Sequence, residues 1–342
     1  MLFENVNNLN SDMIIGKDII DTETNRVLLK SGTKLTPRYI DYLKEHGYKG
    51  IYVENDKYKS VVVEDVISNE LKNETLKSLR NLDINGIMVI AKQIVNEIIS
   101  KTNISFDNLS LINDEYEHSL RVAEMSIVIG KVMGFKEEEL IDLAGSGLLH
   151  DIGKQLKDTH SLKKLGFDGT IGVYRENLYP LYGYRLLQNH SEIKSTIKVG
   201  VLTHNMNIDG SNDFKIDRKL NQHVFGKIIH VTDSYDQVIS NKYEDKVASP
   251  SEALEFLLGG CGTKFDQSIV QIFQKYIPVY PKGTKVLLSN GLTGVVFKNN
   301  DDVPLRPNII LENGKLINLS DFKFNNITII NQTEEIKKNA TL

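Results

Sequence analysis

Hydrophobic residues recur at helical spacing through most of residues 61–281. Apolar residues three, four and seven positions apart share one face of an α-helix, and such a face packs into a core. Ile94 and Ile98 lie on one face of this kind. Four further faces each include an ionisable residue at a position that should be buried: His118, Val122, Met125 and Ile129; Leu140, Ala144, Leu148 and Asp151; Ile193, Ile197, Val201 and His204; and Phe225, Ile229, Asp233 and Asp236. The pattern predicts a mainly α domain over residues 61–281.

A small α/β segment is predicted over residues 1–60. Thr36 followed by Pro37 is typical of a helix start, because the threonine can cap the helix and proline fits its first turn. The helix should cover Arg38–His46 and end at Gly47. The apolar run Ile51–Val53 then predicts a strand.

The pattern changes again beyond residue 281. Turn sequences at Ser289–Gly291 and Asn313–Gly314 separate short apolar runs, and such turns favour β-hairpins. The runs are Lys285–Leu288, Leu292–Lys298, Asn308–Glu312 and Lys315–Leu319. We therefore expect a small β-barrel-like module over residues 282–330 and a flexible polar tail over residues 331–342.

Composition excludes several classes of protein. The 342 residues carry 41 basic and 45 acidic side chains, and the resulting net charge of −4 does not support non-specific DNA binding, which needs a basic surface. The single cysteine, Cys261, excludes an intrachain disulfide and a cysteine-based zinc site, and it fits a reducing compartment. No run approaches the roughly 18–20 apolar residues of a transmembrane helix, and the first residues do not resemble a signal peptide. A cytoplasmic protein without a membrane span is expected.

The strongest chemical signal is the segment Leu148–Lys154, where His150 and Asp151 are adjacent at the end of an apolar helix. A helix end capped by glycine, with Lys154 near the helix dipole, would also explain this segment. An unpaired imidazole or carboxylate is costly to bury, however, so the ionisable groups on the buried faces need partners. One divalent cation would satisfy a set of four, and manganese, iron and zinc suit mixed imidazole and carboxylate ligands. The alternative is a set of hydrogen-bonded core residues; the four are His118, His150, Asp151 and Asp233.

The region 110–280, which contains these four residues, resembles the HD phosphohydrolase superfamily and, within it, the HD-GYP family of cyclic-dinucleotide phosphodiesterases. The resemblance implies an HD-type helical bundle, and the flanking segments are similar to those of some bacterial HD-GYP proteins. It depends on the order of these segments: His118 with Val122, Leu148–Lys154, Tyr179–Gly183, Thr203–Asn205, Asp209–Ser211, Val231–Asp236 and Gly262–Asp266.

The resemblance also implies roles for individual residues. Asp151 would bridge two ions if two bind, and metal-bound hydroxide would attack the phosphodiester. Lys154 would contact a substrate phosphate, which suits an ammonium point charge. Asp114 matches a carboxylate ligand of some members, with a helix-terminal carboxylate as the alternative; His204 matches a further ligand, with a hydrogen-bonded core histidine as the alternative. One or two divalent ions, Mn or Fe, would thus be held by His118, His150, Asp151, His204 and Asp233.

The chain also departs from the family pattern. Tyr179 and Asn205 stand where the family has histidine ligands, and the Gly-Tyr-Pro motif is replaced by Asn212–Phe214. The later arginine motif is only weakly matched by Asn241–Tyr243. A tyrosine with a pKa near 10 is a poor ligand, so the second metal site has lost ligands and the loop that shapes the substrate pocket is altered.

Two functions follow from this interpretation. The first is a metal-dependent phosphodiesterase that acts on cyclic di-GMP, a related cyclic dinucleotide or another phosphoester. The alternative is a catalytically degenerate signalling module that binds a nucleotide or a protein partner without turnover. A homodimer or a signalling protein would be the protein partner in either case.

Overall fold

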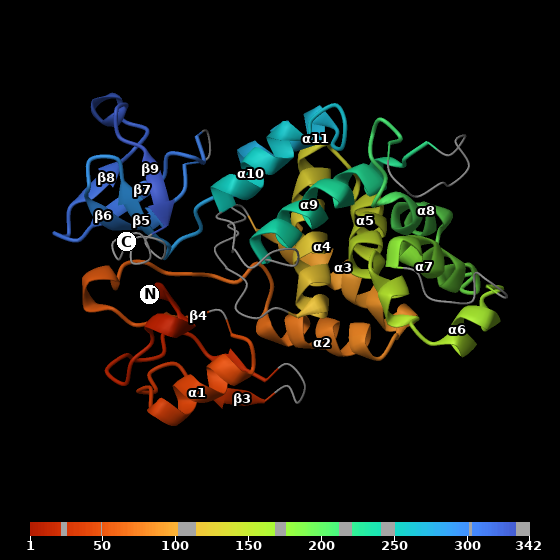
Figure 1. The fold of residues 1–342 in the computed structure, drawn as a ribbon, viewed down its shortest axis with the longest axis horizontal. Helices are drawn as coiled ribbons and strands as arrows, with labels where there is room; N and C mark the ends of the chain where they lie inside the picture. Colours follow the sequence, from red (N-terminus) through yellow and green to blue (C-terminus); the bar gives the residue numbers. More distant parts are fainter. Residues whose placement is uncertain are drawn as a thin grey trace.

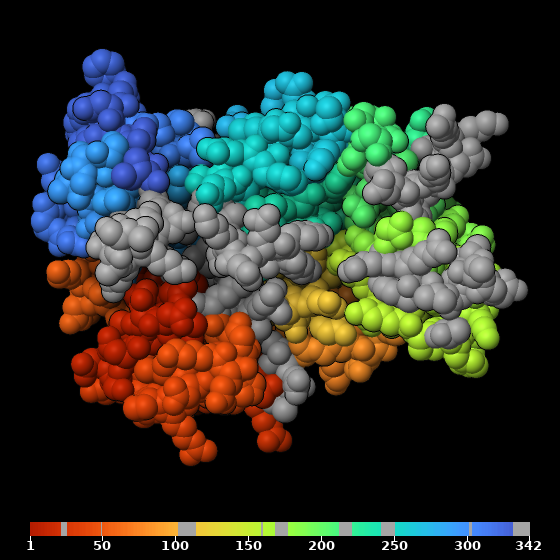
Figure 2. Space-filling view, in the orientation of Figure 1, coloured from red at the N-terminus to blue at the C-terminus, as the bar shows by residue number. Residues whose placement is uncertain are grey.

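A computed structural model describes residues 1–21, 26–48, 50–101, 114–167, 176–211, 221–240, 250–300 and 303–332. The helices form one large body, and the N-terminal and C-terminal units lie next to each other at one end of it (Figure 1). The space-filling view shows the same arrangement, with the two terminal units on one side (Figure 2). The expected fold class, mainly α with a small α/β segment before it and a small β module after it, is confirmed.

The N-terminal unit combines two short strand pairs with one helix. Strand β1 pairs antiparallel with β4, and β2 pairs antiparallel with β3. Helix α1 begins at Pro37, and the Thr36 side chain accepts a hydrogen bond from the backbone N–H of Tyr39, as its sequence predicts. Gly47 follows this helix with a φ of +73°, a conformation that favours glycine. The elements are β1 (Leu2–Asn5), η1 (Val6–Asn8), β2 (Ile19–Ile20), β3 (Val27–Leu29), α1 (Pro37–Glu45), β4 (Gly50–Val53) and η2 (Asp56–Tyr58).

The helical domain is built around α4. This helix packs against α2, α3, α5, α9 and α11, so it is buried on almost every side. Helices α5, α8 and α9 pack against one another beside it and bring the ionisable residues of the predicted faces to one region. The elements are α2 (Asn69–Arg80), α3 (Ile84–Ser100), α4 (Glu115–Val132), α5 (Glu137–Leu149), η3 (Ile152–Gln155), α6 (Thr159–Lys164), η5 (Glu176–Leu178), α7 (Tyr179–Gln188), α8 (Ser195–Thr203), α9 (Val224–Ser240), α10 (Pro250–Gly259) and α11 (Gln267–Tyr276).

The C-terminal unit is one antiparallel sheet with the strand order β8-β7-β6-β5-β9. Successive side chains of a strand point to opposite faces. Val296 and Ile309 accordingly join the core of the helical domain, whereas Val295 and Ile310 join the core of the N-terminal unit. The sheet therefore packs against both. Its elements are β5 (Lys285–Leu288), β6 (Thr293–Lys298), β7 (Asn308–Leu311), β8 (Leu316–Asn318), η6 (Phe322–Phe324) and β9 (Ile329–Gln332).

Candidate metal centre

Five ionisable residues within or at the ends of α4, α5, α8 and α9 meet in the interior of the helical domain. His118 is near the start of α4, and Asp233 is in the middle of α9. His150 and His204 directly follow the last residues of α5 and α8, and Asp151 precedes η3. All five side chains are buried. The structure thus places every one of the predicted ligands in the same region.

Gly153 lets η3, the segment that follows α5 and Asp151, pack directly against α7. A Cβ atom on Gly153 would lie 1.9 Å from the backbone oxygen of Tyr179 and 2.7 Å from the backbone nitrogen of Gly183. Any larger residue would therefore force η3 away from α7. This close packing fixes the backbone from Asp151 to Lys154, and the positions of both side chains depend on that backbone.

The side-chain nitrogen and oxygen atoms of these residues lie close enough together to share a cation. The Nε2 atom of His118 lies 3.0 Å from Oδ1 of Asp233 and 3.8 Å from Oδ2 of Asp151. The Nε2 atom of His150 lies 3.6 Å and 3.5 Å from the same two oxygens. Two overlapping groups have ligand atoms within 4.8 Å of one another: His118, His150 and Asp151 form the first, and His150, His204 and Asp233 form the second.

Hydrogen bonds on the far side of each imidazole orient its ring. The Nδ1 atoms of His150 and His204 lie 2.7 Å and 2.6 Å from the backbone oxygens of Gly147 and Val201. A carbonyl oxygen only accepts, so Nδ1 carries the proton and donates in both rings. The Nε2 atoms are therefore on the side of each ring that faces the site.

Three buried atoms of the site have no hydrogen-bond partner among the described residues: Nε2 of His118, Nε2 of His150 and Oδ1 of Asp151. The approach of His118 to Asp233 is close, but its geometry is not that of a hydrogen bond. Unsatisfied buried polar atoms are rare because each costs about 1–3 kcal/mol. A divalent cation bound by these atoms would remove that cost, so the residues present fit a metal ion.

Asp236 holds His118 from behind. Its Oδ2 accepts a 2.6 Å hydrogen bond from Nδ1 of His118, and its two oxygens accept from Nε and Nη2 of Arg121 at 2.7 Å and 2.8 Å. A carboxylate that orients a ligating imidazole is a recurrent feature of metal sites. Burial opposes ionisation, but Arg121 and His118 outweigh it and lower the pKa of Asp236. The sequence placed Asp236 on a buried face without a role and gave no sign of Arg121, although both lie three residues from a predicted ligand on the same helix.

Charges within the site favour a cation. Burial disfavours a charged imidazole, yet the carboxylates of Asp151 and Asp233 outweigh it and raise the pKa of His150 to about 10. Burial and the neighbouring His150 lower the pKa of His204 to about 4. Burial likewise opposes ionisation of both aspartates, but the adjacent histidines hold the pKa of each below its ordinary value. The two carboxylates are therefore ionised and attract positive charge.

The remaining predicted residues take different positions. Nζ of Lys154 lies 2.5 Å from Oδ2 of Asp151 and 4.4 Å from the centre of the Tyr179 ring. The Tyr179 hydroxyl is 3.2 Å from Nε2 of His204, so it touches the site although it is not a histidine. Asn205 is exposed, whereas the five proposed ligands are buried. Asn212–Phe214 and Asn241–Tyr243 lie outside the described residues.

Asp114 caps a helix. One of its oxygens accepts hydrogen bonds from the backbone N–H groups of Tyr116 and Glu117, at 2.8 Å and 2.9 Å. The other oxygen lies 3.1 Å from Arg80. Both oxygens are thus engaged at the start of α4, which is the helix-terminal alternative that the sequence left open.

A family model described as HD domain matches residues 94–269, just over half of the chain. The chain belongs to the HD domain family. The matched range includes every residue of the candidate metal centre, and the family expected from the sequence is confirmed.

Two curated relatives are named cyclic di-GMP phosphodiesterases. PA4108 from Pseudomonas aeruginosa is 28% identical over 202 residues, covering 58% of this chain and 48% of its own length. PdeB from Borreliella burgdorferi is 24% identical over 208 residues, covering 60% of this chain and 54% of its own. The chain spans about half the length of the curated relatives it matches.

Among solved structures, Bd1817, a HDG"Y"P protein from Bdellovibrio bacteriovorus, matches with a TM-score of 0.51 and 16% identity. The match covers 79% of this chain and 97% of that one, and it shows a common fold. Within the described part of the chain, no helix has the length and apolar character needed to cross a membrane.

Proposed function

We propose that this protein is a metal-dependent phosphodiesterase whose substrate is a cyclic dinucleotide, with cyclic di-GMP as the first candidate. The observation that carries the proposal is the pair of imidazole Nε2 atoms and the carboxylate oxygen that are buried together without hydrogen-bond partners among the described residues. The names of the two curated relatives support the reaction and the substrate. The proposed ligands of one or two Mn or Fe ions are His118, His150, Asp151, His204 and Asp233.

The proposed chemistry assigns each residue one task. A bound divalent cation would polarise a phosphoryl group and lower the pKa of a water molecule that it binds. Asp236 keeps His118 in the tautomer that presents Nε2. The ammonium group of Lys154 would bind a non-bridging phosphate oxygen, since it is a compact charge beside Asp151. Its contact with the Tyr179 ring limits where the side chain can point.

The activity can be tested with the full chain, cyclic di-GMP and added Mn(II) or Fe(II). We expect release of the linear dinucleotide, measured by chromatography. His150→Ala and Asp151→Ala should abolish turnover and lower the metal bound per chain, because each removes a proposed ligand. His190→Ala is the matched control, since His190 pairs with Glu192 away from the site. Unchanged metal content in Asp151→Ala would contradict the ligand assignment.

One observation favours a second candidate, a nucleotide-binding module without turnover. The Tyr179 hydroxyl lies within hydrogen-bond distance of Nε2 of His204, the atom that a second metal ion would need. Binding of cyclic di-GMP without hydrolysis in either metal would support this module. Hydrolysis of other phosphoesters alone would keep the proposed reaction class and reject the substrate.

A further inference from the structure

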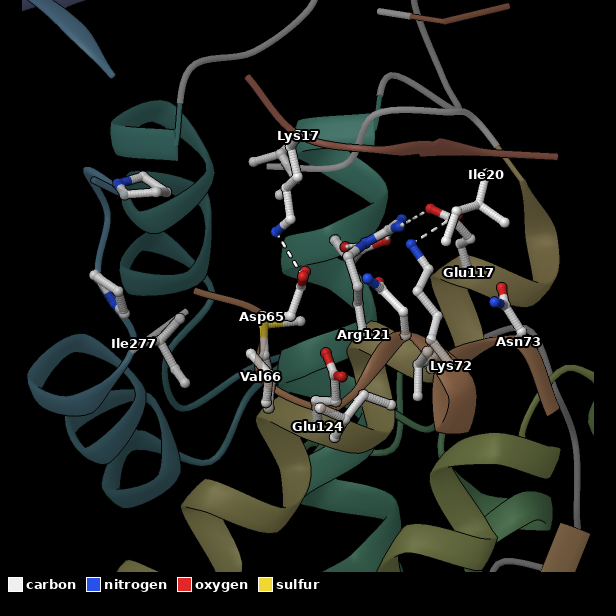
Figure 3. Close-up of a pocket in the computed structure, with 18 of the residues that line it drawn as sticks. Lys17, Ile20, Asp65, Val66, Lys72, Asn73, Glu117, Arg121, Glu124 and Ile277 are labelled. Carbon is white, nitrogen blue, oxygen red and sulfur yellow. Dashed lines mark hydrogen bonds and ion pairs between the residues drawn. The ribbon is translucent and has the colours of Figure 1, made fainter. Parts of the chain in front are cut away.

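A cavity of about 150 Å³ lies between the N-terminal unit and the helical domain (Figure 3). We call it the Glu124 cavity. Its walls come from Lys17–Ile20 beside and within β2, from Asp65–Ile67, from α2, α4 and α9, and from the segment after α11. None of the five proposed metal ligands is among its lining residues, so it is a separate space. Ligand sites occur preferentially where two structural units meet.

The walls are mostly apolar, and their cations are already paired. Lys17 lies 2.6 Å from Asp65, and Lys72 lies 3.0 Å from Glu117 (Figure 3). Arg121 is bound by Asp236, as described above. Three positive charges thus meet three negative charges. The apolar surface includes Ile20, Val66, Leu120, Ile239 and Ile277.

Glu124 is the exception among these charged groups. Its side chain lines the cavity and is only 7% exposed, yet no hydrogen bond or ion pair joins it to any residue of the described ranges. Burial raises the pKa of Glu124 to about 8. Lys72 and Arg121 lower this pKa but are outweighed by burial, and Asp65 and Glu117 raise it by less. Asp18 also lines the cavity outside these pairs, but it is exposed and accepts a hydrogen bond from the backbone N–H of Ser31. Glu124 is therefore the buried acidic side chain in excess of the paired charges.

We propose that the Glu124 cavity binds a small organic cation, with an apolar body of about the size of benzene and one amine or amidine group that pairs with Glu124. A cavity of this volume is large enough for benzene. Because the pKa of Glu124 is about 8, its carboxyl group carries a proton near neutral pH. Binding of the cation would release this proton to solvent, and the charged N–H donor would then make a strong, short hydrogen bond to the carboxylate. An organic cation fits better than a metal ion, because the groups of clustered ligand atoms found in the described chain do not include Glu124.

The proposal can be tested with a matched pair of probes, benzylamine and benzyl alcohol. They have the same size, but only benzylamine is a cation near neutral pH. Each is titrated into the full chain without added metal and followed by calorimetry or NMR. We expect saturable binding of benzylamine at least about tenfold tighter than that of the alcohol, because only the amine makes a charge-assisted bond. The assay does not depend on the metal centre, so its outcome is independent of the proposed activity.

Two variants locate the binding. Glu124→Gln should reduce benzylamine affinity to that of benzyl alcohol, since the amide, unlike the carboxyl group, cannot release a proton and become an anion that pairs with the amine. Ile20→Trp should abolish binding of both probes by filling the cavity from a half-buried wall position. The second variant keeps the test decisive if the first does not fold. Equal affinity for the two probes, no saturable binding of benzylamine, or a benzylamine affinity that is unchanged in folded Glu124→Gln or Ile20→Trp would overturn the proposal.

Discussion

Asp236 offers the sharpest test of how the candidate metal centre is built. Its Oδ2 accepts hydrogen bonds from both His118 and Arg121, and Oδ1 accepts a second one from Arg121. In Asp236→Asn the amide has one acceptor oxygen and no charge, so it cannot replace all three of the bonds from His118 and Arg121. We therefore expect two separate losses, one in metal affinity and one in stability.

Both losses can be estimated from the contacts. Removing one partner of a buried ion pair costs about 3–5 kcal/mol, because the other charge remains buried. Arg121 keeps Glu117 at 3.6 Å, so we expect the lower end of that range, about 3 kcal/mol. Loss of the carboxylate behind a ligating histidine lowers metal affinity by about 10- to 100-fold. Stability would be measured by urea unfolding and affinity by titration with Mn(II).

Two further variants separate these effects. Ser240→Ala removes the 3.3 Å hydrogen bond to Asp236 and leaves the bonds from His118 and Arg121 in place, so it should change neither quantity appreciably. Adding Arg121→Met to Asp236→Asn removes the unpaired charge, so stability should recover while metal affinity stays low. A folded Asp236→Asn protein with the metal affinity of the wild type would refute the idea that Asp236 orients His118.

Three other substitutions have distinct expected outcomes. Gly153→Ala should destabilise the protein by about 3 kcal/mol, the upper end of the usual cost of overpacking, because the new Cβ would overlap the backbone of Tyr179. Gly259→Ala, with no neighbouring atom within 4 Å, should be neutral in the same thermal unfolding assay. Burial raises the pKa of Glu124 from its ordinary value of 4.5 to about 8. Between pH 4.5 and about pH 8 the folded chain therefore binds one more proton than the unfolded chain, and the stability of the wild type falls as the pH rises through this range. Glu124→Gln should therefore gain about 2–3 kcal/mol relative to wild type between about pH 5.5 and pH 8 in urea unfolding, and an equal difference at both pH values would contradict this. Tyr179→His should raise the metal bound per chain, measured by elemental analysis, by placing an imidazole beside His204, whereas Tyr179→Phe should leave it unchanged.

Periodicity in the sequence predicted which side of each helix faces the interior. A period of 3.6 residues fixes that side, so His118 and Asp233 could be placed in the core before their neighbours were known. It could not predict the pairing of Arg121 with Asp236, because these residues are 115 positions apart and meet only when α4 packs against α9. The same limit applies to Glu124, whose environment includes residues from the N-terminal unit.

Short strands were predicted less completely than helices. Four of the five C-terminal strands coincide with the apolar runs Lys285–Leu288, Leu292–Lys298, Asn308–Glu312 and Lys315–Leu319. The fifth, β9, extends to Gln332 and so includes the first residues of the expected tail. The apolar run of β9 is very short. Its hydrogen bonds come from pairing with β5, which the local sequence pattern cannot predict.

Arg121 connects the two proposed sites. Its guanidinium lines the Glu124 cavity on one side and on the other binds the carboxylate that holds His118. If a molecule in the cavity changes the affinity for a metal ion by some factor, thermodynamic linkage requires the ion to change the affinity for that molecule by the same factor. Amine-containing buffers and metal titrations would then be coupled variables, so an apparent metal constant would have meaning only with the amine concentration stated beside it.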